Sequence, residues 1–431
     1  MSAATSGRAA RLGLLAIWSV GVLAYVVSIT NRTSLSALGV DAAHHFGIDP
    51  VTLSLFAVMQ LAVYGALQVP VGLLLDRFGP RAVLTGGMLV LAVSQVVLAL
   101  APSVPLAIIA RLLLGAGDAA IFPSLLRVIG IRFPRRTAPV VVQVTGLLGQ
   151  FGQIVSVIPF AFLVHAQGWM RGFLLLAATT ALCGVLTWVV VRERGERSTE
   201  RIDVMANVRT AWREPGTRLG FWTHFTTPFA GNAFAVLWGY PFLVNAQGVA
   251  PRTAQLLFTI YVLFGLVAGP VIGALSARFA AHRTRLVVAL VGVQIVAWVA
   301  VLAFPGPAPV AFLVVLAVAM CIGGPSSMLA FDFAREHNPP MRLSTATGIV
   351  NSAGFLSSVL ALLAIGAVLT LLDPTNAYGL TAFRAAELIQ VPLWAIGIVM
   401  VLRSASALRR RSREFEPDGA SRNPDAVGAG V

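Results

Sequence analysis

The chain has 431 residues, of which 57% are hydrophobic and only 11% are charged, and its mean hydropathy is +0.84. Soluble domains average about 25% charged residues, so the composition indicates an integral membrane protein. The formal net charge is +14 and all 31 basic residues are arginine, which excludes a Walker A phosphate loop and a lysine Schiff base.

About 20 apolar residues are needed to cross a bilayer as a helix. The chain contains twelve such stretches along its whole length, which predicts an all-α integral membrane protein with twelve transmembrane helices. The expected spans are 12–34, 51–74, 83–101, 105–129, 138–164, 170–191, 219–243, 253–277, 286–304, 309–331, 344–372 and 381–403.

The connections between these spans alternate between arginine-rich and nearly uncharged segments. Because cytoplasmic loops carry the excess of arginine, this pattern predicts a multi-pass protein of the cell membrane with both termini in the cytoplasm. A nucleic-acid surface is the other explanation for a basic chain, but its arginines would not alternate with the spans, so no nucleic-acid partner is expected. The basic connections contain Arg77 and Arg81, Arg132 to Arg136, Arg192 to Arg218, Arg278 to Arg285, Arg335 and Arg342, and the segment after Arg403.

The longest internal connection, 192–218, separates the expected six-helix halves 12–191 and 219–403. Residues 1–11 are expected to form a cytoplasmic N-terminus and 404–431 a disordered cytoplasmic tail.

Within the central connection, Ile202, Met205 and Trp212 fit one face of a short interfacial helix. A solvated linker is an equally good interpretation of the same residues.

The connection after the second span has a degenerate copy after the eighth. "GLLLDRFGPRAVL" begins at Gly72 and "GALSARFAAHRTRLV" begins at Gly273, and the Gly, Leu, Arg and Phe of the first copy recur at matching positions in the second. The two copies lie about half a chain apart, which indicates parallel six-helix repeats.

The first copy closely resembles the signature loop of the major facilitator superfamily, G-x-L-x-D-R-x-G-R-R, with Pro80 in place of one basic residue. This resemblance covers residues 12–403. It implies two six-helix bundles around a central cavity that opens alternately to each side of the membrane. It also implies a carrier for a small-molecule substrate that works as a monomer in the lipid bilayer, without a cofactor or metal.

The residues of this loop are expected to gate the carrier and to fix its topology. Gly72 permits close helix approach, Gly79 permits a tight turn, and Arg77 and Arg81 anchor the loop to the cytoplasmic leaflet. In the family the acid at Asp76 faces the start of the eleventh helix, where the positive helix end favours an anion.

That helix starts here at "RLSTATG", with Ser344 or Thr345 as expected caps.

The fourth span carries two charges, Arg111 and Asp118, seven residues apart on one helix face. Each would cost roughly 2.5–3.5 kcal/mol near the bilayer centre, so both are expected to face the bundle interior. Three interpretations remain open: a static internal pair, a proton-coupling site at Asp118 beside Arg111, or a direct substrate contact.

The first span carries Arg32 after Asn31 and the upstream Tyr25, and all three are candidates for binding the substrate, with Asn31 expected to donate to the same ligand as Arg32. This arrangement resembles the Asp-Arg pair of the anion:cation symporter branch, whose first-helix arginine binds a substrate anion. In the same branch, an arginine of the fourth helix and an acid seven residues later take part in proton coupling. Arg111 and Asp118 match this spacing. Asn31 stands where the branch often has aspartate, which leaves the proton stoichiometry open. Alternatively, Arg32 snorkels to the outer interface.

Further polar residues on the spans are candidates for lining a substrate cavity. Interhelical packing is the alternative role, and for the glutamines it is the favoured one. The candidates are Tyr64, Gln68, Gln150, His224, Asn232, Trp238 and Asn351.

Together these patterns predict a proton-coupled secondary transporter for a small organic anion. The fifth helix lacks the Gly-Pro signature of antiporters in this superfamily, which favours uptake. A drug or metabolite exporter is the alternative within transport, and a non-transporting membrane sensor is the alternative outside it. No HExxH or GxSxG motif occurs, so no enzyme is expected.

Overall fold

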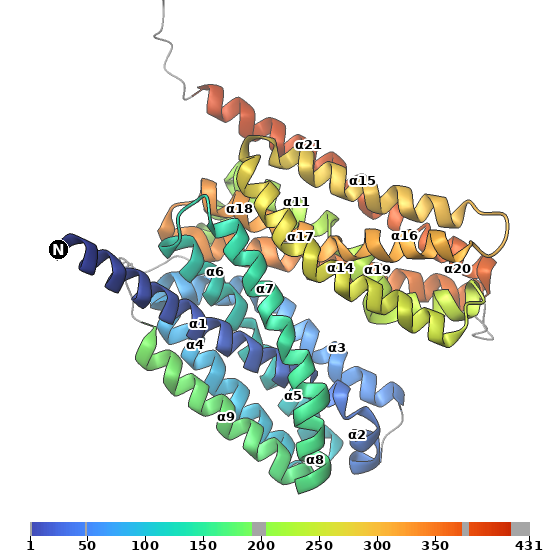
Figure 1. The fold of residues 1–431 in the computed structure, drawn as a ribbon, viewed down its shortest axis with the longest axis horizontal. Helices are drawn as coiled ribbons and strands as arrows, with labels where there is room; N and C mark the ends of the chain where they lie inside the picture. Colours follow the sequence, from blue (N-terminus) through green and yellow to red (C-terminus); the bar gives the residue numbers. More distant parts are fainter. Residues whose placement is uncertain (1, 48–49, 192–203, 373–378, 415–431) are drawn as a thin grey trace, which may run out of the picture.

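A computed structural model describes residues 2–47, 50–191, 204–372 and 379–414 of the chain, and these residues form helices joined by turns (Figure 1). The N-terminal half comprises α1 Ser2–Ala37, α2 Gly39–Phe46, α3 Pro50–Ala66, α4 Gln68–Ala99, α5 Val104–Ala119, α6 Ile121–Arg132, α7 Ala138–Val155, the π-helix η1 Ser156–Phe160, α8 Ala161–Gln167 and α9 Trp169–Val190.

The short helix α10, Val204–Arg213, connects the halves. The C-terminal half comprises α11 Pro215–Thr226, α12 Phe229–Ala233, η2 Phe234–Trp238, α13 Gly239–Pro241, η3 Phe242–Ala246, α14 Pro251–Arg278, η4 Ala280–His282, α15 Arg283–Leu302, α16 Val310–Cys321, α17 Gly323–Ser327, α18 Leu329–His337, η5 Pro340–Arg342, α19 Leu343–Leu372, α20 Leu380–Glu387 and α21 Gln390–Glu414.

Proline residues explain where several long helices break. Proline lacks an N–H, so the carbonyl four residues earlier loses its helical partner. Four helices end at that earlier residue. The pairs of helix end and proline are Ala66 and Pro70, Ala119 and Pro123, Val155 and Pro159, and Cys321 and Pro325.

Ten helical segments of the described chain are long and apolar enough to cross a membrane. The two expected spans outside this set are both interrupted. The span expected at 51–74 is divided between α3, which has 17 residues, and the start of α4. The span expected at 219–243 is divided into α11 to η3 by π-helical turns and by Pro228 and Pro241. The fold is nevertheless that of an all-helical membrane protein.

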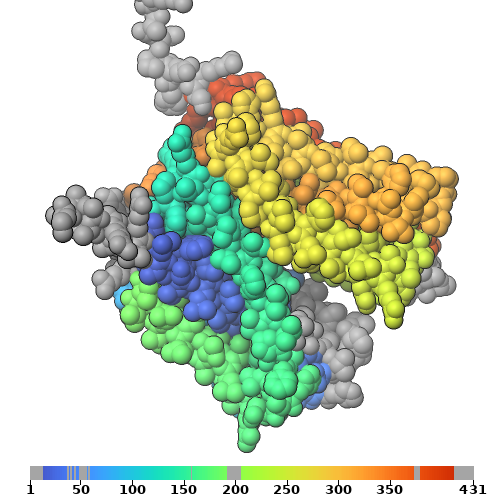
Figure 2. All heavy atoms as spheres, in the orientation of Figure 1, coloured from blue at the N-terminus to red at the C-terminus, as the bar shows by residue number. Residues whose placement is uncertain are grey.

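The two halves contact one another mainly at one end of the molecule. In Figures 1 and 2, α7 of the N-terminal half and α14 of the C-terminal half touch near one end and then diverge. At the contact, a Cβ on Gly273 would lie 2.8 Å from the Gln143 side chain, and Gln143 Nε2 donates to the Pro325 carbonyl at 2.7 Å.

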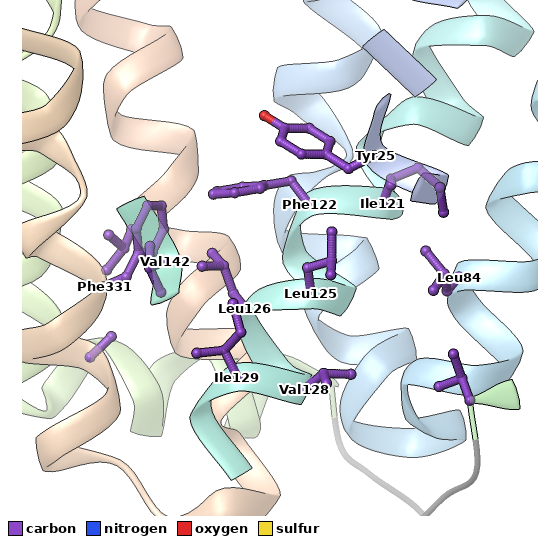
Figure 3. Close-up of a cluster of buried hydrophobic side chains, with 14 of the residues drawn as sticks. Tyr25, Leu84, Ile121, Phe122, Leu125, Leu126, Val128, Ile129, Val142 and Phe331 are labelled. Carbon is purple, nitrogen blue, oxygen red and sulfur yellow. The ribbon is translucent and has the colours of Figure 1, made fainter. Parts of the chain in front are cut away.

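A buried apolar cluster joins the halves at the same end. Figure 3 shows Phe122 and Leu126 of α6 pointing toward Phe331 of α18 and Val142 of α7. The rings of Phe122 and Phe331 have their centroids 6.0 Å apart. Burying these side chains stabilises the closed contact between the halves through the hydrophobic effect.

The helices extend beyond the expected spans at both ends of the chain. α1 begins at Ser2 rather than near residue 12, and α21 continues to Glu414, so residues 404–414 are helical rather than a disordered tail. The segment "SASALRRRSRE" contains four arginines and two alanines, which are strong helix formers. The rest of the expected tail, 415–431, lies outside the described residues.

The central connection contains α10, which packs on the protein. Trp212 places its ring 5.1 Å from Phe221 of α11, whereas Met205 is 73% exposed. Asn207 donates to Thr345 Oγ1 at 3.3 Å. Ile202, the third residue of the expected apolar face, lies outside the described residues.

Candidate functional site

An ion pair between α1 and α5 forms the centre of the candidate site. Arg32 Nε lies 2.6 Å from Asp118 Oδ2, and Ser28 Oγ donates to Asp118 Oδ1. The Asp118 side chain is 1% exposed, whereas that of Arg32 is 23% exposed. The carboxylate is therefore enclosed and the guanidinium is reachable from open space. This geometry differs from snorkelling, because Arg32 points to an acid of a neighbouring helix.

Arg111 does not make the ion pair expected from its spacing to Asp118. Its Nη2 donates to Gln60 Oε1 of α3 and to the Arg32 carbonyl, the latter at 3.1 Å. Two helical turns separate Arg111 and Asp118, so their side chains reach different neighbouring helices. Of the three interpretations left open, the static Arg111–Asp118 pair is therefore absent from this structure, and Arg32 rather than Arg111 holds Asp118.

Arg111 nevertheless remains a buried cation close to the pair. It is 2% exposed, and its Nε and Nη1 have no hydrogen-bond partner in the described part of the chain. Arg32, Arg111 and Asp118 together carry one more positive than negative charge. Because an unmatched charge is costly in a membrane, this cluster favours an additional anion.

Of the two candidate tyrosines, Tyr64 contacts Arg32, whereas Tyr25 packs against α7. The Arg32 guanidinium carbon is 4.9 Å from the ring centroid of Tyr64, a cation–π contact. Tyr64 also packs against Phe355 of α19, with centroids 4.7 Å apart. Tyr25 is 8% exposed and its ring fills the space beside Gly149 of α7. Tyr64 therefore contacts both Arg32 and the opposite half.

Asn31 points away from the Arg32 site. Its Nδ2 donates to the Val27 carbonyl at 2.7 Å and to Thr180 Oγ1 of α9 at 2.9 Å, and the residue is fully buried. Consecutive residues of an α-helix project about 100° apart, so Asn31 and Arg32 face different neighbours. The expectation that both bind one ligand was wrong, and Asn31 joins α1 to α9.

Gln68, Asn351 and His224 lie between the site and the closed end. Asn351 Nδ2 donates to Gln68 Oε1 at 2.5 Å, which links α19 to α4 across the two halves. His224 Nδ1 lies 3.0 Å from the Ser327 carbonyl, and its ring packs on Gly354. These contacts favour the packing role over ligand binding for Gln68 and His224 in this conformation.

Three further candidates lie where the halves diverge. Gln150 is exposed and lies seven residues beyond Gln143, on the face of α7 that contacts the other half. Asn232 Nδ2 donates to Ser358 Oγ at 2.8 Å, and Trp238 Nε1 donates to the Leu362 carbonyl at 3.0 Å. Both of the last two are half-buried against α19, so they form part of the opposite wall.

Asp76 caps the first turn of α19 from the opposite half. Its carboxylate accepts hydrogen bonds from the backbone N–H groups of Ser344 at 3.1 Å and Thr345 at 2.8 Å, and from Thr345 Oγ1 at 2.5 Å. Ser344 or Thr345 had been expected to cap α19. The helix begins at Leu343, so both residues lie within its first turn instead. The free N–H groups of a helix start favour an anion.

Arg127 of α6 completes the contact between Asp76 and the first turn of α19, which is the expected gate. Its Nη1 bonds to Asp76 Oδ1 and donates to Ser344 Oγ at 2.6 Å. Both charges are buried, so the pair compensates the cost of removing Asp76 from water. Arg127 was not among the expected residues, because nothing in the apolar run "SLLRVIGIR" indicates which helix it faces.

The remaining residues of the gating motif act through the backbone and the surface. Gly79 has φ 76°, a left-handed conformation that glycine adopts without steric cost, and it forms the turn inside α4. Arg77 is exposed beside Phe78. Arg81 differs from the expected lipid anchor, because its Nε donates to the Trp188 carbonyl at 2.8 Å and its guanidinium stacks on the Trp188 ring.

Gly72 permits a close backbone approach between the halves. A Cβ at this position would lie 2.4 Å from the Ser344 carbonyl oxygen and 2.9 Å from Thr345 Cα. Both of these are backbone atoms, which cannot rotate out of the way. A side chain at residue 72 is therefore incompatible with the closed gate.

We expect Gly72→Val to open this end of the molecule. Spin labels at Arg135→Cys and Met341→Cys, both exposed and on opposite halves, should show a longer distance in the valine variant. Gly86→Val is the matched control in the same helix, because a Cβ there meets nothing within 4 Å. An unchanged distance distribution with Gly72→Val would mean that this contact does not hold the gate closed.

With this geometry established, comparison with known proteins identifies the class. A family model described as Major Facilitator Superfamily matches residues 21–238 and 220–427. The chain belongs to the major facilitator superfamily, and it is therefore a secondary transporter rather than an enzyme.

Curated relatives include three transporters named for organic acids. A probable sulfoacetate transporter of Cupriavidus necator is 23% identical over 278 residues, which is 61% of this chain and 64% of the relative. A probable galactarate/D-glucarate transporter of Escherichia coli is 26% identical over 41% of each chain. A probable L-galactonate transporter of Escherichia coli is 26% identical over 40% of this chain and 38% of the relative. The matches thus span less than two thirds of these relatives.

The fold has a counterpart among solved structures. A bacterial homolog of the human lysosomal transporter Spinster, in an inward-facing and unoccupied conformation, aligns with a TM-score of 0.57 and 16% identity. The alignment covers 92% of this chain and 98% of the homolog. At this identity the likeness shows the fold alone, which agrees with the family assignment.

Proposed function

We propose that this transporter carries a small organic anion in symport with protons, and that the Arg32–Asp118 ion pair couples the two. The observation that carries the proposal is that the partly exposed Arg32 is held by an enclosed carboxylate. One guanidinium edge cannot bind both Asp118 and a substrate carboxylate in full, so the two anions compete for it.

Protonation of Asp118 resolves this competition. A neutral carboxyl binds Arg32 weakly, so the guanidinium is released to hold a substrate anion through its planar array of donors. Ser28, whose hydroxyl donates to ionised Asp118, can instead accept a hydrogen bond from the protonated carboxyl. Loading of the proton therefore favours loading of the anion, which is the energetic requirement for symport.

The net charge of the site supports an anionic substrate. When Asp118 is protonated, Arg32 and Arg111 together contribute two positive charges to an enclosed region. A substrate carboxylate, sulfonate or similar group offsets part of this charge, whereas an uncharged drug does not. The names of three curated relatives, which refer to sulfoacetate, glucarate and galactonate transport, agree with this substrate class.

The closed gate determines the side from which the site is reached in this conformation. Asp76, Arg127 and the buried cluster close one end, while the halves diverge toward the other end. We assign the closed end to the cytoplasm, because the arginine-rich connections lie there, and both termini to the same side. The site then opens to the outside, as uptake into the cell requires, and the carrier acts as a monomer.

Cysteine labelling tests the orientation. We expect Arg135→Cys and Arg411→Cys to be protected from a membrane-impermeant thiol reagent in intact cells and Pro307→Cys to be labelled, since all three positions are exposed. Permeabilised cells provide the control for reactivity at each position. Labelling of Arg135→Cys or Arg411→Cys from outside would reverse the assignment. Arg192, also expected in the cytoplasm, lies outside the described residues.

Uptake by the reconstituted protein tests the transport activity. Proteoliposomes with an acidic exterior should accumulate at least one of sulfoacetate, D-glucarate and L-galactonate above its external concentration. Collapse of the pH gradient by a protonophore should abolish the accumulation. Accumulation that survives the protonophore would contradict proton coupling, and transport restricted to uncharged compounds would favour the drug or metabolite exporter.

A further inference from the structure

An open cavity lies in the C-terminal half, apart from the Arg32 site. It has a volume of about 870 Å³ and is lined by residues of α11, η4, α15, α18 and α21. Figure 1 shows α15 and α21 running side by side along the outer edge of this half, away from the N-terminal half. The cavity is therefore lined by the C-terminal half alone.

The wall of the cavity combines two chemistries. Val288 and Ala289 of α15 and Leu402 and Ala405 of α21 provide an apolar surface. Arg285 of α15 and Arg409 of α21 also line the cavity. Each arginine lies one to two helical turns from the apolar lining residues of its own helix. The wall thus combines two cationic groups with an apolar surface, and His282, Thr284, Glu336 and His337 complete the polar part of the lining.

The cations of this cavity have no protein counter-charge among the residues that the structure describes. Arg285 and Arg409 are exposed and take part in none of the described ion pairs. Glu336 also lines the cavity, but its carboxylate is held by Arg283 Nη1 at 2.8 Å. The cavity therefore presents two uncompensated guanidinium groups, which together match a phosphate group.

The cavity lies at the end of two candidate membrane spans. Arg285 is in the first turn of α15, within the span Ala280–Leu302, and Arg409 is near the end of the span Leu380–Arg411. Arginine at such positions lies at the level of the lipid headgroups, and Leu402, seven residues before Arg409, lies on the hydrocarbon side. A phospholipid needs the same arrangement, with cations beside its phosphate and apolar side chains along its acyl chain.

We propose that this cavity binds an anionic phospholipid, whose phosphate contacts Arg285 and Arg409 and whose acyl chain covers the apolar wall. The bound lipid bridges α15 and α21 and thereby stabilises the C-terminal half. A phosphate compound without acyl chains satisfies only the cationic end, and a zwitterionic lipid leaves the net positive charge unmatched.

The test compares lipids on the purified full-length protein in detergent. Dioleoyl phosphatidylglycerol should raise the Tm, followed by tryptophan fluorescence, more than dioleoyl phosphatidylcholine or inorganic phosphate does. Native mass spectrometry should show retained phosphatidylglycerol. Arg285→Gln/Arg409→Gln should lose both effects. Arg278→Gln/Arg410→Gln is the matched control, because it removes the same charge from exposed arginines that do not line the cavity.

A second variant tests the acyl contact. Ala289 is exposed and lines the cavity, so Ala289→Phe should fill the apolar part without altering the charge and should weaken phosphatidylglycerol retention. An equal Tm rise with inorganic phosphate, or full retention in Ala289→Phe, would overturn the lipid assignment in favour of a simple anion site. If both double variants lost the Tm rise and the lipid retention to the same extent, the effect would come from the overall charge of the protein and the proposed site would be wrong. None of these readouts depends on transport.

Discussion

Asp118→Asn is expected to abolish uphill accumulation of the substrate while leaving its exchange down a gradient intact. Asparagine keeps the shape of the neutral acid and can still accept from Ser28, but it cannot gain or lose a proton. Arg32 is then free for the substrate at every pH. Counterflow and proton-driven uptake, measured on the same proteoliposomes, separate these two activities.

Asp41→Asn provides the control for loss of one carboxylate. Asp41 of α2 forms an exposed pair with His165 of α8 at 3.2 Å, and it is not a partner of Arg32 or Ser28 among the described contacts. This variant should accumulate substrate as the wild type does. Should Asp118→Asn do so as well, Asp118 would have only the static role of compensating Arg32.

Arg32→Lys is expected to insert and fold but to bind the substrate poorly. Lysine keeps the charge but lacks Nε and the planar fork, so it loses a charge-assisted hydrogen bond worth roughly 1.5–3 kcal/mol. That loss corresponds to about a 10- to 100-fold increase in Kd. Binding titration of the substrate on purified protein measures this change, and the amount of monodisperse protein reports folding.

The lysine variant also separates the two roles assigned to Arg32. The exposed Arg252→Lys should leave Kd unchanged and serves as the control. Wild-type binding by Arg32→Lys would contradict two-pronged recognition, because a point charge at this position would then suffice. A raised Kd together with preserved proton coupling would indicate that the introduced ammonium group still exchanges between Asp118 and the substrate.

The gating motif illustrates what the sequence predicts well. Gly79 indicated a tight turn, and the resemblance of this loop to the family signature implied that Asp76 faces the start of the eleventh helix; the structure has both features. Arg127 was not predicted, because its partner lies 51 residues earlier in the chain and on another helix. Pairing between helices depends on their rotation, which hydropathy does not define.

The same limit explains the errors at the candidate site. Helical spacing placed Arg111 and Asp118 on one face, but it did not indicate that Arg32 of α1 and Gln60 of α3 would reach them first. Chain proximity also suggested a shared ligand for Arg32 and Asn31, although adjacent residues of a helix face different neighbours. Long-range contacts between helices decided both cases.

The proline breaks have a mechanical consequence for the N-terminal half. The break after Ala66 separates α3, with Tyr64, from the part of α4 that carries Asp76, and the break after Ala119 separates Asp118 from the helix that carries Arg127. Where a backbone hydrogen bond is missing, a helix bends at lower cost than elsewhere. Two hinges therefore lie between the ion pair and the gate. At these hinges, the segments that carry Asp76 and Arg127 can tilt relative to the helices that carry Tyr64 and Asp118.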